Sequence, residues 1–427
     1  MTKVFDALPA LPVLPEEPLY DCGDGAFLRL WRGITRDAFD AFCTTLAADG
    51  WRRTADCACG GVCGADYVRD GVLLHLTWDG DLRVTADPRA VLPPQTNDCP
   101  RVAQTEFYQF ETDHSLIDCG MCYVFRCADG SFFVIDSAHS FSLHDDVRLH
   151  GFLRSLTPGD GPIRIAGWYF THGHSDHICK FMDFLQFCCA DVELQGVYAN
   201  FPSVDHRNSG EWMASEKNRI TRFRELLAER PAIPVYKVRS MQRFAVRNLV
   251  CTVLCTHEDV FPRSCEDFND TSAVLRVETE GTVVLIPGDA SREASDVLVA
   301  RYADGLACDI LQLAHHGHTG CRTEFYERAH ARVLLVPNTR IKYEEERPRR
   351  PENTVAENLA QEVYVSAEGT VGLPLPYTAG AAELYPDETT EDFAGIYDLW
   401  QYEYSDAFRQ KVREDYERRH ARPKPGV

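Results

Sequence analysis

The sequence contains no long, uninterrupted apolar run of the kind that enters or crosses a membrane. A signal peptide needs a basic start followed by a continuous apolar stretch, and a membrane helix needs about 20 apolar residues. The first 21 residues do not provide either, because four prolines interrupt them: Pro9, Pro12, Pro15 and Pro18. The sequence therefore argues against secretion and membrane insertion, and we expect the protein in the cytoplasm.

Basic residues are also in short supply. The chain has 44 Lys and Arg against 65 Asp and Glu, a net charge of −21. Long nucleic acids bind mainly through Lys and Arg contacts to phosphate, so a chain this acidic is expected to repel them. Arg347–Pro351 is basic, but Glu344–Glu346 precedes it, which favours a solvated loop over a clamp for a small anion. We expect a small-molecule substrate.

Cysteine is plentiful, yet its pattern lacks the spacing of a common zinc finger. The 17 cysteines are odd in number and scattered through a large chain, which is typical of reduced thiols. The alternative is a structural zinc site shared by two groups, Cys57, Cys59 and Cys63 in one and Cys119 with Cys122 in the other. This zinc site is disfavoured because the C-x-C-x-x-x-C spacing of the first group is not that of a zinc finger, and because an apparent strand would bury the second group.

The most informative segment is Thr171–His177, THGHSDH, which places three histidines and an aspartate within six positions. A strand-like run precedes it and an amphipathic, helix-like pattern follows. Imidazole and carboxylate are the ligands that zinc and its neighbours prefer. Alternate positions on a short loop point the same way, so His172 and His174 are expected to hold one ion while Asp176 and His177 turn toward a second. The segment therefore predicts a site for two metal ions.

This motif resembles the first metal motif of the metallo-β-lactamase superfamily. The likeness covers about residues 105–376, and the order of the segments is similar to that in the β-lactamase-like domains of bacterial competence (DNA-uptake) channel proteins and their soluble relatives. It implies an α+β fold, a four-layer αββα sandwich in which Asp136 buttresses the metal loop. The segments that carry it are Met121–Phe125 with Gly130–Asp136, Asn269–Leu275, Val284–Asp289, Leu313–Gly317, and Val363–Ser366 with Gly369–Leu373, which resemble a closing strand pair.

The resemblance also implies the remaining ligands. Asp289 matches the carboxylate that bridges both ions. His257 ends a strand-like run where the family has the third imidazole of the first ion, and His206 is the alternative, disfavoured because strand ends hold ligands more rigidly than loops. For the last imidazole we prefer His315 over the adjacent His316, because His315 lies nearer the end of its strand.

The expected activity is hydrolysis by a metal-bridging hydroxide, with two divalent ions as cofactors and zinc favoured over manganese or iron. The favoured substrate is a small anion, a phosphodiester or phosphate ester, as the competence-channel resemblance implies. Proton delivery to the leaving group is expected from Asp176, His316 or His318. The seven expected metal ligands are His172, His174, Asp176, His177, His257, Asp289 and His315.

Three other functions stay open. One is hydrolysis of a lactone, thioester or amide on the same fold. Another is a flavodiiron-like redox protein, disfavoured because those proteins have glutamate where this chain has His174 and carry a flavin module. The third is a non-catalytic metal-binding scaffold, disfavoured because the expected ligands are all present. The chain has no G-x-S-x-G elbow, so it offers no competing serine mechanism.

Three segments are expected from the 427 residues. Residues 1–100 predict a small α+β domain, in which Thr35 caps a helix and Asp70-Gly71 and Asp79-Gly80 make hairpin turns. Residues 101–380 predict the catalytic domain. Residues 381–427 are acidic and aromatic and end in a helix, Ser405–Arg419, that packs on the surface or against a second subunit of a homo-oligomer. The helices expected in the catalytic domain span about Leu143–Leu156, His177–Cys189, Glu216–Ala228 and Arg292–Tyr302.

Overall fold

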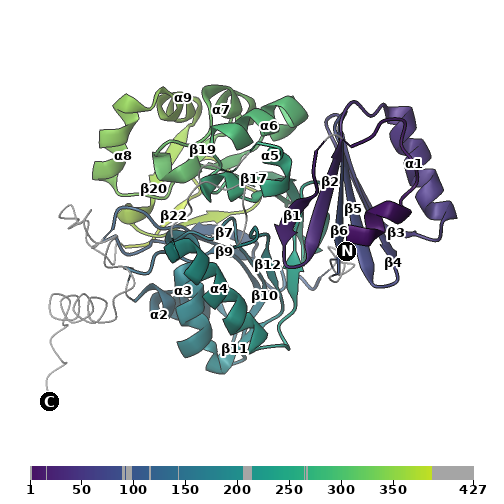
Figure 1. Cartoon of the computed structure of the whole chain (residues 1–427). Helices are drawn as coiled ribbons and strands as arrows, with labels where there is room; N and C mark the ends of the chain where they lie inside the picture. The colour runs from purple at the N-terminus through teal and green to yellow at the C-terminus, as the bar shows by residue number, and fades with distance from the viewer. Residues whose placement is uncertain are drawn as a thin grey trace, which may run out of the picture.

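The computed structural model describes residues 2–386 apart from 16, 89–91, 93–98, 115–116, 143, 205–213, 264 and 266–267. The described residues form three β-sheets and the helices that cover them (Figure 1). One sheet belongs to the N-terminal domain, and the other two pack together in the larger domain. The predicted helix Ser405–Arg419 lies outside the described residues, as does His206.

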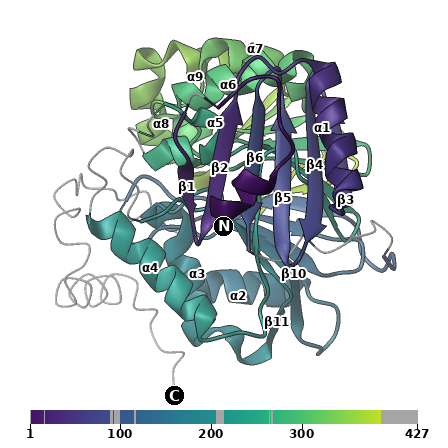
Figure 2. The ribbon, with the colours of Figure 1, turned by 45° about the vertical axis from the view of Figure 1, so that its right-hand side comes forward.

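The N-terminal domain is a six-stranded antiparallel sheet with α1 (Arg36–Ala48) on one face (Figure 2). Thr35 caps this helix as predicted, because its hydroxyl accepts a hydrogen bond from the Ala38 amide at 3.3 Å. Asp70 and Gly71 both have positive φ and form the predicted turn between neighbouring strands. In sheet order the strands are β1 (Tyr20–Gly23), β2 (Ala26–Trp31), β6 (Leu82–Asp87), β5 (Val72–Trp78), β4 (Val62–Arg69) and β3 (Arg52–Cys59).

The larger domain is built on two mixed sheets. The nine-stranded sheet runs β13 (Val235–Lys237), β12 (Val197–Ala199), β10 (Ile163–Tyr169), β9 (Phe132–Asp136), β8 (Cys122–Arg126), β7 (Glu106–Gln109), β21 (Val371–Pro374) and β22 (Glu383–Leu384), with β11 (Val192–Leu194) also paired to β10. The seven-stranded sheet runs β14 (Arg243–Val246), β15 (Leu249–Cys255), β16 (Val274–Thr279), β17 (Thr282–Ile286), β18 (Ile310–Gln312), β19 (Val333–Val336) and β20 (Glu362–Val365).

Helices cover the outer face of each sheet, which makes four layers. The nine-stranded sheet carries α2 (Asp145–Leu156), α3 (Ser175–Phe187) and α4 (Ala214–Ala228). The seven-stranded sheet carries α6 (Arg292–Tyr302), α7 (Thr323–Ala329), α8 (Arg340–Glu346) and α9 (Pro351–Leu359), and the short α5 (His257–Val260) follows β15.

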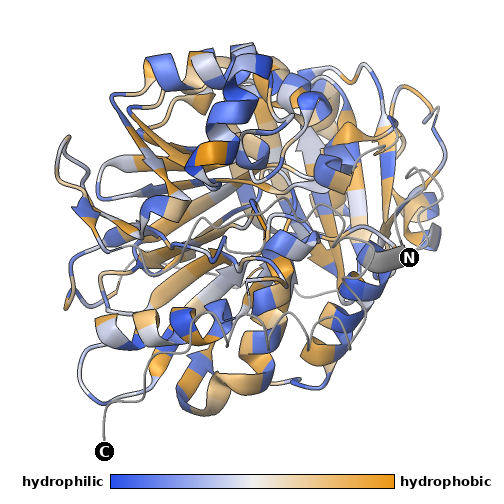
Figure 3. Ribbon diagram, turned by 90° about the vertical axis from the view of Figure 1, so that its left-hand side faces the viewer, coloured by the Kyte–Doolittle hydropathy of each residue, from blue (hydrophilic) through white to orange (hydrophobic). Residues whose placement is uncertain are grey.

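Apolar side chains fill each space between these layers. One cluster lies between the sheets and includes Ile135 and Leu275, and separate clusters join each sheet to its helices. Figure 3 shows the same pattern, with hydrophobic colour along the strands and hydrophilic colour on outward-facing helix positions. Such layering is how a helix stripe and a sheet face bury their apolar surface. The predicted αββα sandwich after a small α+β domain is confirmed.

Two expectations about the end of the chain differ from the structure. The resemblance implied that Val363–Ser366 and Gly369–Leu373 form a strand pair, but β20 belongs to the seven-stranded sheet and β21 to the nine-stranded sheet. The short helical turn η7 (Ser366–Glu368) lies between them and carries the chain from one sheet to the other. In addition, β22 pairs with β21, so residues 383–384 of the expected extension complete the sandwich.

The face of the N-terminal sheet opposite α1 docks on the sandwich through buried polar groups. His75 contacts the Asp66 carboxylate at 2.6 Å and the Ser240 carbonyl oxygen at 2.8 Å. Arg301 donates to Asp79 and to Asp259, both at 2.6 Å. His75 is thus a residue of the interface between the N-terminal sheet and the sandwich. A search of the described residues finds no helix with the length and apolar character needed to span a bilayer.

Candidate metal centre

The ligand loop lies between β10 and α3. His172 and His174 follow the strand, and α3 begins at Ser175, two residues earlier than predicted. Asp176 and His177 therefore sit in the first helical turn, where the helix backbone fixes them. His172 and His177 are fully buried, and His174 is half-buried.

Asp136, at the end of β9, supports this loop as the resemblance implied. Its carboxylate accepts hydrogen bonds from the Thr171 amide at 2.8 Å, the Thr171 hydroxyl at 2.7 Å and His177 Nδ1 at 2.7 Å. A neutral imidazole carries one N–H, and here Asp136 holds it on Nδ1. His177 Nε2 is thereby left as a lone-pair donor that faces the centre of the site.

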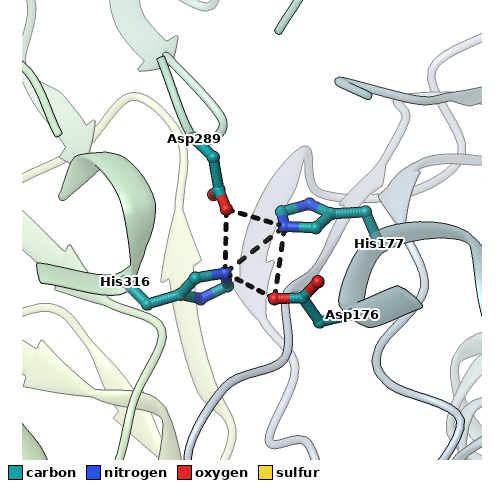
Figure 4. Close-up of side chains that lie close together, drawn as sticks. All are labelled: Asp176, His177, Asp289 and His316. Atoms are coloured by element: carbon teal, nitrogen blue, oxygen red, sulfur yellow. Dashed lines mark hydrogen bonds and ion pairs between the residues drawn. The ribbon is translucent and has the colours of Figure 1, made fainter. Parts of the chain in front are cut away.

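Four buried side chains converge in one group: Asp176, His177, Asp289 and His316 (Figure 4). His316 Nε2 lies 2.9 Å from Asp176 Oδ2 and 3.4 Å from Asp289 Oδ2. His177 Nε2 lies 3.3 Å from Asp289 Oδ2 and 3.3 Å from His316 Nε2. One ligand atom from each residue lies within 4.8 Å of all the others. Two imidazoles and two carboxylates form a donor set that suits a divalent ion of the first transition row.

A second group comprises His172, His174 and Asp289, so Asp289 belongs to both groups. His172 Nε2 lies 3.7 Å from Asp289 Oδ2 and 2.9 Å from His174 Nδ1. The other oxygen, Asp289 Oδ1, is buried without a hydrogen-bond partner among the described residues. A buried, unpaired carboxylate oxygen is costly unless a cation or donor meets it. The residues therefore fit a pair of cations that share Asp289.

The ionisable side chains of the site shift one another's pKa values. Burial alone would raise the pKa of Asp176 and Asp289, but the adjacent imidazoles of His177 and His316 hold both carboxyl pKa values well below their usual range. Burial alone would lower the pKa of the two imidazoles, but the carboxylates raise it, for His316 to about 10. A divalent ion would replace these protons as the positive charge of the site, so its binding releases protons.

His316, and not the preferred His315, belongs to the four-residue group. Both residues have positive φ, 51° for His315 and 53° for His316, and so adopt the left-handed backbone conformation. Because the strand conformation does not continue through them, nearness to the strand end does not decide which ring points inward. The Pro337 carbonyl oxygen lies 2.9 Å from His316 Nδ1 and leaves Nε2 for the site. His315 Nε2 instead faces the Asn269 amide nitrogen at 3.1 Å and lies 4.0 Å from Asp289 Oδ2.

His318 lies beside this group without joining it. Its ring centroid is 5.6 Å from that of His315, and it is half-buried. Burial, together with the neighbouring His315, lowers the pKa of His318 to about 3. The ring is therefore neutral at physiological pH.

His257, the expected third imidazole of the first ion, lies outside both groups. Its Nδ1 faces the Tyr20 hydroxyl at 3.0 Å, and its Nε2 faces Asn200 Oδ1 at 3.1 Å. The structure continues from β15 into α5 at His257, with a capping box formed by Thr256 and Asp259. This turn carries the ring to β1 of the N-terminal domain, a contact that the sequence pattern did not indicate.

Two further sets of residues, the cysteines and the basic run, supply no member of either ligand group, although Cys119 lies beside Asp176. Among the described residues, no cation-ligating group contains a cysteine, and no cysteine forms a disulfide. In the basic run, Arg347 pairs with Glu357 at 3.1 Å and Arg350 with Glu346 at 3.3 Å. The segment is helical and not the expected loop, because α8 ends at Glu346, a short helical turn spans Arg347–Arg349 and α9 begins at Pro351. Both guanidinium groups are paired with carboxylates of the chain itself.

One residue of the site was missed. Glu216, in the first turn of α4, is buried and has its Oε1 3.2 Å from His174 Nε2. From the sequence, Glu216 is expected only to be part of a helix, because no motif links it to His174, 42 residues earlier. Only the packing of α4 brings the two together.

Comparisons with known proteins give weak likenesses. No protein-family model and no curated protein matches the chain. Among solved structures it is similar to the metallo-β-lactamase fold protein YhfI from Bacillus subtilis, with 13% identity over 62% of this chain and 97% of YhfI and a TM-score of 0.38. It is also similar to yeast PDE1 (10% identity, 64% and 100% covered, TM-score 0.41) and the short form of human tRNase Z (12%, 61% and 95%, 0.35). At such scores, the functional assignment depends on the site itself.

Proposed function

We propose that the protein is a dinuclear metal-dependent hydrolase. The observation that carries this proposal is the position of Asp289, whose carboxylate is common to both ligand groups and retains one buried, unpaired oxygen. A carboxylate shared in this way sets the separation of two cations. A single structural ion would not require the second group, in which His172 and His174 also lie beside Asp289.

The first ion would be held by His172, His174 and Asp289, and the second by Asp176, His177, Asp289 and His316. Two divalent ions bound there would supply Lewis acidity and an activated water for hydrolysis. Zinc is proposed because imidazole and carboxylate suit it, with manganese and iron as alternatives.

The chain's own residues contribute positioning and proton transfer. Asp136 and the Pro337 carbonyl oxygen fix the rings of His177 and His316, so that the Nε2 atom of each faces the site. Asp176 is proposed to pass a proton to the leaving group, and His315 is the alternative at the edge of the site. His318 is less suited as a donor, because its low pKa leaves the ring neutral. His316, the third expected proton donor, is assigned to metal binding instead.

The proposed substrate is a small phosphodiester or phosphate ester. The net charge of −21 opposes binding of a long polyanion, whereas two ions offer local positive charge to a single phosphate group. The likeness of the sequence motifs to the competence-channel domains favours the same substrate class. Lactones, thioesters and amides are the alternatives on this site. Cytoplasmic location and homo-oligomerisation stay predictions.

The test is metal analysis followed by a hydrolase screen. Gently purified protein should contain close to two divalent ions per chain. With zinc or manganese added, it should cleave one of a panel of phosphodiester, phosphomonoester, lactone, thioester and β-lactam substrates. Asp289→Asn should lose metal and activity, while Asp296→Asn, at a half-exposed position of α6 that pairs with Arg322, should lose neither. Metal content that no added ion restores to two would overturn the dinuclear assignment, and an iron chromophore with oxygen consumption would indicate redox chemistry.

A further inference from the structure

Helix α4 packs directly against the ligand loop of the first ion. A Cβ at Gly173, between His172 and His174, would lie only 2.9 Å from Ile220 Cγ1. Arg219, also buried, donates to the Gly173 carbonyl oxygen at 3.4 Å. Because real Cβ contacts are longer than this, only glycine lets the helix approach so closely. The first turns of α4 therefore form a fixed wall behind the loop.

From this wall Glu216 reaches His174. Its Oε1 lies 3.2 Å from His174 Nε2, while the other ring nitrogen, Nδ1, faces His172 Nε2 at 2.9 Å. The two nitrogens of one imidazole thus face different partners, a carboxylate on one side and the ligand group on the other. A neutral imidazole donates through one nitrogen and offers a lone pair on the other. A carboxylate at Nε2 selects the form whose lone pair is on Nδ1.

We propose that Glu216 is a positioning residue for the first metal ion: it holds the hydrogen of His174 on Nε2 and directs Nδ1 to the ion. This inference rests on the proposed dinuclear site. Glu216 adds a contact from α4, a helix outside the ligand motif. This contact helps to hold the first ion, for which the described residues offer only two histidines and the shared aspartate as ligands.

Cobalt(II) is the probe, because stepwise titration of metal-free protein gives both dissociation constants and the visible absorption of each bound ion. His174→Ala identifies which constant belongs to the first ion. Glu216→Ala should weaken that same constant about 10- to 100-fold, the usual effect of removing a carboxylate behind a ligating histidine, and should leave the other constant unchanged. Glu216→Gln should bind the first ion nearly as tightly as the parent, because the amide oxygen still accepts a hydrogen bond from His174 Nε2. Glu225→Gln, an exposed change on the same helix, is the matched control.

Three results would overturn the proposal while the parent still binds two ions. Glu216→Ala could bind both ions as the parent does, or it could weaken both equally, which would indicate general damage to the fold. Glu216→Gln could weaken the first ion as much as Glu216→Ala, which would mean that the carboxylate acts as a ligand or by its charge. If the parent does not bind two ions, the dinuclear assignment itself fails. Melting curves in chelator show whether each variant folds.

Discussion

Asp136 offers a sharp test of how the fold supports the second ion. The carboxylate is fully buried and accepts three hydrogen bonds, two from Thr171 and one from His177. Asp136→Asn keeps the shape but replaces one oxygen by an NH₂ group. If Oδ1 is replaced, the NH₂ group faces the Thr171 amide N–H, and if Oδ2 is replaced, it faces His177 Nδ1–H. In either case two donors face each other.

The expected cost has two separate parts. Loss of one hydrogen bond to a charged, buried acceptor lowers the free energy of unfolding by about 1.5–3 kcal/mol. If the imidazole of His177 moves its hydrogen to Nε2 to meet the amide, it loses the lone pair that faces the ion. Affinity for the second ion should then fall about 10- to 100-fold, as for other partners of ligating histidines.

The matched control is Asp129→Asn, in the turn that joins β8 to β9. Asp129 is also buried, accepts from the Ser131 amide at 3.0 Å and pairs with Arg247 at 2.9 Å, but it contacts no ligand of the site. Urea unfolding in chelator measures stability, and competition with a zinc chelator measures affinity. Both variants should lose stability, and only Asp136→Asn should lose zinc affinity. Equal zinc affinity in Asp136→Asn and the parent would refute the role given to Asp136.

Three other outcomes are expected. His316→Ala should abolish binding of the second ion in a metal titration, while His315→Ala should keep both ions; the reverse result would restore the assignment from sequence. Burial lowers the pKa of His114 to about 4, so the unfolded chain takes up a proton below about pH 6.5 that the folded chain does not. This group alone should lower the free energy of unfolding by about 3 kcal/mol between pH 6.5 and 4. His114→Gln, unfolded in chelator across that range, should show a smaller fall, and an identical fall would exclude His114 as a cause. A small phosphodiester should have a higher kcat/KM than long DNA, and efficient cleavage of long DNA with a steep loss of affinity in salt would instead indicate a basic groove.

Local patterns in the sequence determined much of the architecture. The helix Arg292–Tyr302 and the cap at Thr35 were predicted correctly, because apolar periodicity and capping act within a few residues. The close spacing of His172, His174, Asp176 and His177 likewise brings these side chains together on one loop and one helical turn. Neighbours this near in the chain have little freedom to lie apart.

Contacts between distant segments were decided by the tertiary structure alone. Positive φ at His315 and His316 turns the second ring inward, and helical continuation at His257 carries its imidazole to Tyr20 of another domain. Glu216 reaches His174 only because α4 packs on the ligand loop. Sequence spacing describes which residues are near along the chain, whereas the direction of a side chain depends on backbone dihedrals and on the packing of whole elements, which involve residues far apart in the sequence.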